Sequence, residues 1–238
     1  MDEDYQRFQI AGETEDSARI LSILSAIQEG KLKNDLRLVN YFHEVPLSYA
    51  ATVVSVAPGA VELEVHQHQA VAISLAKLTV LKSSHFPQDV IASVVDVSVK
   101  HSLVRMNRFA FGILRAERRM SVRVRLDDHI RADFSSPDEQ ASGTLEDMSL
   151  SGVSVVIDGT SRPFAGSVKG DLTVELPTGT VTVQASLLKL RQVPKGWRAV
   201  FQISAGRVEE ESIARFIMQR QVAIIRELKD HPELKRSA

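Results

Sequence analysis

The residues of this chain that are best suited to ligand chemistry fall into two short segments. The first is Arg118-Arg119-Met120-Ser121-Val122-Arg123, and the second is Asp147-Met148-Ser149-Leu150-Ser151-Gly152. An arginine donates two parallel hydrogen bonds to phosphate oxygens or to the O6/N7 edge of guanine. Arg119 and Arg123 are four positions apart, which places both guanidinium groups on one side of either a helical turn or an extended strand.

The second segment supplies complementary groups. The carboxylate of Asp147 can accept from the N1/N2 edge of guanine, which is not the edge that arginine binds. The hydroxyl of Ser149 can donate to a phosphate, and Gly152 allows a close approach of the backbone or a positive φ in a turn. Taken singly, each segment also fits an ordinary explanation, as a solvated basic face or as a plain turn. Their order, their separation and the strand-like runs after them favour a ligand site.

Together the two segments resemble the ligand signature of the PilZ family, whose members bind the bacterial second messenger cyclic di-GMP. The resemblance covers about half of the chain and implies a six-stranded antiparallel barrel. It implies ligand binding by Arg118, Arg119, Arg123, Asp147, Ser149 and Gly152. Because a guanidinium also stacks on bases, Arg118 suits the second molecule of an intercalated cyclic di-GMP dimer, and we expect two ligands per chain.

Composition sets the frame for this site. With 238 residues, 44% hydrophobic and 25% charged, the chain is large enough for two domains of ordinary size. A formal net charge of -1 gives no global field that would hold a polyanion, so an anion site must be local. The arginines concentrated between Arg105 and Arg125, against the single acid Glu117, supply such a local field.

Other features indicate a cytoplasmic protein. The chain has no cysteine, which excludes disulfides and thiolate metal sites and agrees with a reducing compartment. Its acidic start is unlike a secretory leader, and no run approaches the ~18 apolar residues of a membrane span. We expect no metal and no cofactor other than the ligand itself.

We expect a mainly β fold of two small antiparallel β-barrels with an N-terminal and a C-terminal helix. The first domain, residues 1–113, begins with a helix over 14–28, followed by short valine-rich strands. The predicted strands cover residues 36–39, 50–56, 60–65, 70–75, 78–82 and 90–97. In pattern and position this domain resembles the split-barrel-like N-terminal domain of YcgR-type PilZ proteins. His66 and His68 would share one strand face, but without a third ligand they do not indicate a metal site.

The second domain, residues 114–238, is predicted to be the PilZ barrel with a closing helix. Alternation from Met120 to Leu126 indicates a half-buried strand that turns Arg123 to the open side. Further predicted strands cover residues 129–134, 143–146, 152–157, 172–176, 181–193 and 196–203. The helix over 208–229 has an apolar stripe and carries acids at its start and bases at its end, as the helix dipole favours.

The resemblance implies a receptor whose interdomain arrangement changes on ligand binding and controls an unidentified partner in motility, biofilm formation or secretion. We expect a non-enzymatic protein that is either a monomer or a homodimer. A nucleic-acid-binding regulator that responds to cyclic di-GMP is the alternative. The near-neutral charge and the lack of a helix-turn-helix pattern make nucleic acid an unfavoured partner. The sequence has no nucleophile elbow, metal-ligand cluster or phosphate loop that would indicate an enzyme.

Overall fold

The computed structural model describes residues 5–114, 122–126, 128–166 and 168–235, which fold into two units. Unit 1 comprises Met1–Phe42, Pro46–Met120 and Ile225–Ala238, and unit 2 comprises His43–Val45 and Ser121–Ile224. Each unit is built around an antiparallel sheet that closes on itself. The predicted domain boundary after residue 113 adjoins a segment outside the described residues and stays a prediction.

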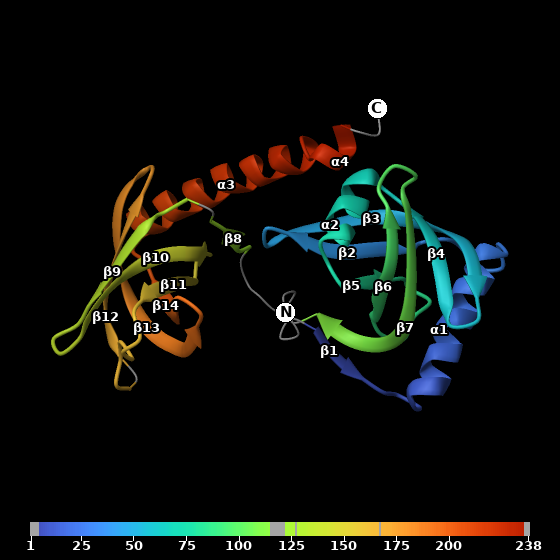
Figure 1. Ribbon diagram of the computed structural model, residues 1–238, viewed down its shortest axis with the longest axis horizontal. Helices are drawn as coiled ribbons and strands as arrows, with labels where there is room; N and C mark the ends of the chain where they lie inside the picture. Colours follow the sequence, from blue (N-terminus) through green and yellow to red (C-terminus); the bar gives the residue numbers. More distant parts are fainter. Residues whose placement is uncertain (1–4, 115–121, 127, 167, 236–238) are drawn as a thin grey trace. The chain divides into compact units, whose positions relative to one another are not determined.

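Unit 1 is a closed barrel of six strands with one strand added at its side (Figure 1). Its strands are β1 (Tyr5–Phe8), β2 (Arg37–Phe42), β3 (Val45–Ala57), β4 (Ala60–Val65), β5 (Leu78–Lys82), β6 (Val90–Ser98) and β7 (Leu103–Leu114). The order is β7-β4-β3-β2-β5-β6, the pairing of β6 with β7 closes the ring, and β1 pairs with β7. Alternate residues of β4, namely Val61, Leu63 and Val65, are buried inside the barrel.

Helix α1 (Glu13–Gln28) packs against β7 and buries Ile20, Leu24 and Ile27 at helical spacing. The start of this helix is fixed by Asp16, which is 2% exposed. Its carboxylate accepts from the backbone N–H groups of Ile10, at 2.8 Å, and Ala11, at 3.1 Å. The predicted helix over 14–28 is confirmed.

Helix α2 (Gln67–Ser74) replaces the strand predicted over residues 70–75, and that prediction is wrong. The ring nitrogen Nδ1 of His66 accepts from the backbone N–H of His68 and caps the helix. Residues 69–73 are all buried, so the sequence shows no amphipathic period that would distinguish a helix from a buried strand. His66 and His68 therefore lie at a helix start and not on a strand face.

Strand β7 is not among the strands predicted from the sequence. Arg105 and Arg108 were instead counted among the arginines of a local basic field. Both arginines lie on this strand of unit 1, whereas Arg123 and Arg125 belong to unit 2. Alternation along β7 is interrupted at Arg108, whose φ is 52°. This interruption explains why the period of 2 was not recognised.

Unit 2 has the same plan of six ring strands and one added strand. Its strands are β8 (Val124–Arg125), β9 (Arg131–Ser135), β10 (Gln140–Met148), β11 (Gly152–Asp158), β12 (Lys169–Leu176), β13 (Gly179–Val193) and β14 (Gly196–Ser204). The order is β11-β14-β13-β12-β9-β10, the pairing of β10 with β11 closes the ring, and β8 pairs with β10. Phe134, Phe164 and Phe201 form a mutually packed aromatic core.

The chain ends with α3 (Arg207–Lys229) and the short α4 (Pro232–Lys235). Ile213, Phe216, Ile217, Ile224 and Leu228 form the buried stripe of α3. The predicted closing helix and the mainly β fold of two six-stranded barrels are confirmed.

Candidate functional site

The pairing of β8 with β10 brings Arg123 and Asp147 together. Val124 lies opposite Met148, and Arg125 lies opposite Asp147. The Nε atom of Arg123 is 3.4 Å from Oδ1 of Asp147, and the two side chains are 25% and 16% exposed. These two predicted site residues, one from each segment, therefore form a partly buried ion pair.

A β-bulge in β10 sets the direction of the acidic side chains. Leu145 pairs with Val155 and Asp147 pairs with Ser154, so Glu146 is an extra residue without an opposite partner on β11. Leu145 and Met148 are both fully buried. Strict alternation would turn positions 145 and 147 to the same side, whereas the bulge leaves both Glu146 and Asp147 outside the core.

Glu146 is held by residues that the sequence analysis did not single out. Its Oε1 accepts from Nη2 of Arg198 at 2.6 Å, and its Oε2 accepts from the hydroxyl of Ser154 at 3.3 Å. Ser154 is 1% exposed and lies opposite Asp147 in the sheet. Only the strand register places Arg198 here, because β14 is distant in sequence from both motifs. This network fixes the backbone that carries Asp147.

The turn between β10 and β11 is closed by the other two described motif residues. The backbone N–H of Ser149 donates to the carbonyl of Gly152 at 2.8 Å, and the Ser149 hydroxyl donates to the same oxygen at 3.1 Å. A Cβ atom at Gly152 would lie 3.2 Å from the carbonyl oxygen of Phe201 on β14. In this structure Ser149 and Gly152 thus shape the turn, and the close approach of β14, not a positive φ, favours glycine at position 152.

Strand β8 is also fixed from α3. The Nε of Arg220 donates to the carbonyl of Arg125 at 3.1 Å. The sequence analysis did not give Arg220 a positioning role, because its contact follows only from the docking of α3. Arg220 thus holds the β8 backbone, which begins one residue after Arg123.

The other predicted ligand residues, Arg118 and Arg119, lie outside the described residues. The structure brings together Arg123, Asp147 and the Ser149–Gly152 turn within unit 2. Among the described residues, no group of three or more His, Cys, Asp and Glu side chains could hold a metal ion. None of the described helices is long and apolar enough to cross a membrane.

Comparison with known proteins identifies the class of unit 2. Residues 117–219 match the family model of the PilZ domain, a range that contains all six predicted site residues. This part of the chain is assigned to the PilZ domain family, and the resemblance drawn from the two motifs is confirmed. No curated protein matches the chain.

Several solved structures match this chain at low sequence identity. The cyclic di-GMP complex of MrkH from K. pneumonia is 11% identical with a TM-score of 0.48, covering 93% of this chain and 100% of that chain. The cyclic di-GMP complex of YcgR from Escherichia coli is 11% identical with a TM-score of 0.44, covering 96% and 97%. The inhibitor of motility MotI/DgrA from Bacillus subtilis is 13% identical with a TM-score of 0.41, covering 79% and 95%.

Proposed function

We propose that this chain is a cytoplasmic, non-enzymatic receptor for cyclic di-GMP. The proposed site lies on the outer face of the unit 2 barrel, where β8 meets the turn between β10 and β11. The observation that carries the proposal is the contact between Arg123 and Asp147, which come from the two motifs and meet at 3.4 Å within a PilZ domain. An arginine and a carboxylate side by side match the acceptor and donor edges of guanine.

In this proposal Arg119 and Arg123 bind phosphate or the O6/N7 edge of one guanine, and Asp147 accepts from an N1/N2 edge. The ion pair supports this assignment because both groups are partly accessible, so a ligand can replace each partner without uncovering a deeply buried charge. The hydroxyl of Ser149 already donates to the Gly152 carbonyl and could donate to a phosphate only by giving up that bond. Ser149 therefore contributes to the proposed site by stabilising the turn.

We infer that the ligand also restrains the two units. Arg118 and Arg119 lie in the stretch between β7, the last strand of unit 1 before the motif, and β8 of unit 2. A ligand bound by these arginines and by Asp147 would tie this stretch to the barrel, and the charge-assisted contacts would offset its loss of entropy. The restrained arrangement would then control a partner protein in motility, biofilm formation or secretion.

Calorimetric titration of the full chain with cyclic di-GMP tests the assignment of the site. Arg119→Ala, Arg123→Ala and Asp147→Ala should each weaken binding about tenfold or more, because each removes a charged hydrogen-bonded contact. The matched control is Arg131→Ala, which removes an exposed arginine paired with Asp133 on β9. Unchanged affinity in all three site variants would contradict the assignment.

The same titration gives the stoichiometry. We propose two ligand molecules per chain, with Arg118 stacking on the second, so Arg118→Ala should lower the molar ratio from two toward one. A ratio of one for the unmodified protein, or an unchanged ratio in Arg118→Ala, would exclude the intercalated dimer. The affinities of the Arg119, Arg123 and Asp147 variants would still test the site of the first ligand molecule.

A further inference from the structure

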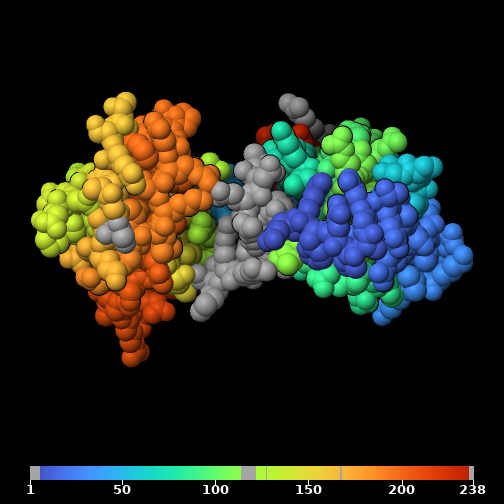
Figure 2. Space-filling model, turned by 90° about the horizontal axis from the view of Figure 1, so that it is seen from below, coloured from blue at the N-terminus to red at the C-terminus, as the bar shows by residue number. Residues whose placement is uncertain are grey.

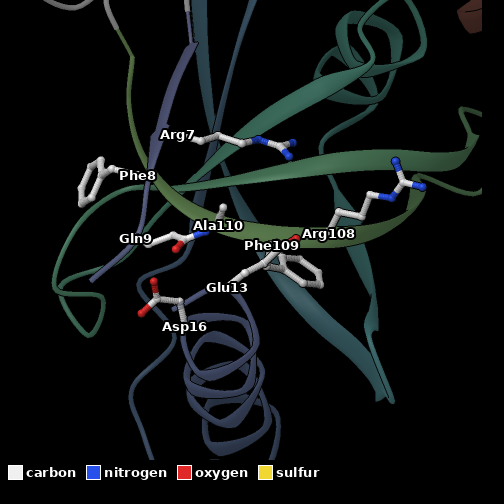
Figure 3. Close-up of a pocket in the computed structure, with 8 residues that line it drawn as sticks. All are labelled: Arg7, Phe8, Gln9, Glu13, Asp16, Arg108, Phe109 and Ala110. Atoms are coloured by element: carbon white, nitrogen blue, oxygen red, sulfur yellow. The ribbon is translucent and has the colours of Figure 1, made fainter. Parts of the chain in front are cut away.

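Unit 1 contains a cavity that the proposed receptor function does not use. Its volume is about 630 Å³, within the range of small-molecule sites. β1, β7 and the start of α1 line it (Figure 3). The N-terminal part of this lining, from β1 to the start of α1, is dark blue and faces the viewer in Figure 2. All lining residues belong to unit 1.

A β-bulge turns Arg108 to this cavity. Asn107 lies opposite Ser93 and Ala110 lies opposite Ile91, so β7 has one residue more than β6 between these pairs. Val104 and Met106 are buried, and strict alternation would send residue 108 into the core as well. Instead Arg108 is exposed and Phe109 is buried.

The bulge places a strained residue at the cavity wall. Arg108 adopts φ 52°, a left-handed conformation that is unfavourable for a non-glycine residue and is concentrated at functional sites. Within the described part of the chain, its guanidinium group makes no hydrogen bond and no ion pair. The described contacts of unit 1 therefore give no structural reason for an arginine at this position.

A second arginine reaches the cavity from β1. The pairing of Arg7 with Gly112 fixes its position, and a Cβ atom at Gly112 would collide with Ile91 and lie 3.0 Å from the carbonyl oxygen of Gln6. The Nη2 of Arg7 donates to the hydroxyl of Ser93 at 3.3 Å. Figure 3 shows Arg7 and Arg108 extending to the same side, whereas Phe8 points away.

The acids of the cavity differ in their availability. Asp16 accepts from two backbone N–H groups and is buried, whereas Glu13 is exposed. The two arginines and two carboxylates of the lining balance in formal charge. Because Asp16 is buried and bonded to the backbone, the two guanidinium groups, which extend to the same side, form a local positive region with Glu13 as the available acceptor. We propose that this cavity binds a small molecule that carries a phosphate or carboxylate group, held by Arg7 and Arg108, and an N–H donor that bonds to Glu13.

Calorimetry on the full chain with three probes tests the proposal. Adenosine monophosphate carries a phosphate and an amino group, L-glutamate carries carboxylates and an ammonium group, and adenosine has no anion. Binding of the nucleotide or of the amino acid assigns the anion as phosphate or carboxylate. Binding of neither probe, or equal binding of adenosine and its monophosphate, overturns the proposal.

Variants on β7 locate the binding. Arg108→Gly removes the cation and relaxes the positive φ, so the fold is retained, and binding should weaken about tenfold or more. Arg105→Ala, which removes an exposed arginine outside the cavity on the same strand, should bind normally. Asp147→Ala should also bind normally, which separates this cavity from the site in unit 2. Retained binding in Arg108→Gly, or loss in Asp147→Ala, would contradict the assignment.

Discussion

In the proposed site, the Arg123–Asp147 pair is ordered and partly exposed. The facing atoms Nε and Oδ1 are buried and 3.4 Å apart, while other parts of each side chain are exposed, so the proposal has a ligand replace this contact from the exposed side. The backbone beneath the pair is fixed by stronger contacts, including the 2.6 Å bond from Arg198 to Glu146. This arrangement lowers the cost of ordering the site when a ligand binds.

His68 in unit 1 has a pKa that its surroundings lower. Burial lowers the pKa of His68 below its ordinary value, and the nearby charges of His66 and Lys229 lower it further. Because the folded pKa lies below the unfolded value of about 6.5, the unfolded chain binds more protons as the pH falls through that value. The free energy of unfolding should therefore decrease below about pH 6.5.

Urea denaturation at a series of pH values measures this dependence. In His68→Gln the decrease below about pH 6.5 should be smaller than in the unmodified protein. The control is His101→Gln, which changes an exposed histidine other than His66 and His68. It should show the same decrease in the free energy of unfolding as the unmodified protein. An identical pH dependence in the unmodified protein and His68→Gln would show that His68 does not contribute.

At the scale of elements, a buried polar network fixes α2 on its barrel. Asn40 on β2 is fully buried, and its Oδ1 accepts from Gln69 of α2 at 2.8 Å and from Thr79 of β5 at 2.7 Å. Asn40→Ala would leave both donors buried without this acceptor. We expect a loss of about 3 kcal/mol in the free energy of unfolding, measured by urea denaturation.

The control for this prediction is Gln67→Ala, at an exposed position in the first turn of α2. It should change the free energy of unfolding by less than about 0.5 kcal/mol. A similarly small effect of Asn40→Ala would mean that water or a rearranged neighbour satisfies Gln69 and Thr79, and that the network does not hold the helix.

The elements also show what could be predicted from the sequence. Strand β4, which has one buried face, was predicted with its observed bounds because period-2 alternation is a local signal. Strand β5 was also predicted with its observed bounds, although its three central residues are all buried, because a short valine-containing run is a local signal as well. Helix α2 was missed because it is buried all round, and β7 because a bulge breaks its alternation. The motif residues of the proposed site were predicted from residue type, from spacing and from the family resemblance. Arg198 and Ser154 were not, because strand register alone brings them to Glu146.

For the whole molecule, the proposal predicts that the ligand restrains the two units. The chain contains no cysteine, so Thr52→Cys in unit 1 and Thr178→Cys in unit 2 provide two exposed labelling sites for energy-transfer measurements. Cyclic di-GMP should narrow the distribution of transfer efficiencies. The same labels with Asp147→Ala should show no narrowing at that ligand concentration. A distribution that the ligand leaves unchanged in the unmodified chain would contradict the restraint.

The central claim is that the PilZ domain of this chain recognises guanine through Asp147 beside Arg123. Equilibrium titration of the full chain with cyclic di-GMP and with cyclic di-AMP tests it most directly, because adenine lacks the N1–H and N2 donors that Asp147 would accept. The account predicts binding of cyclic di-GMP and at least about tenfold weaker binding of cyclic di-AMP. Equal affinity for the two dinucleotides, or no binding of cyclic di-GMP, would contradict it.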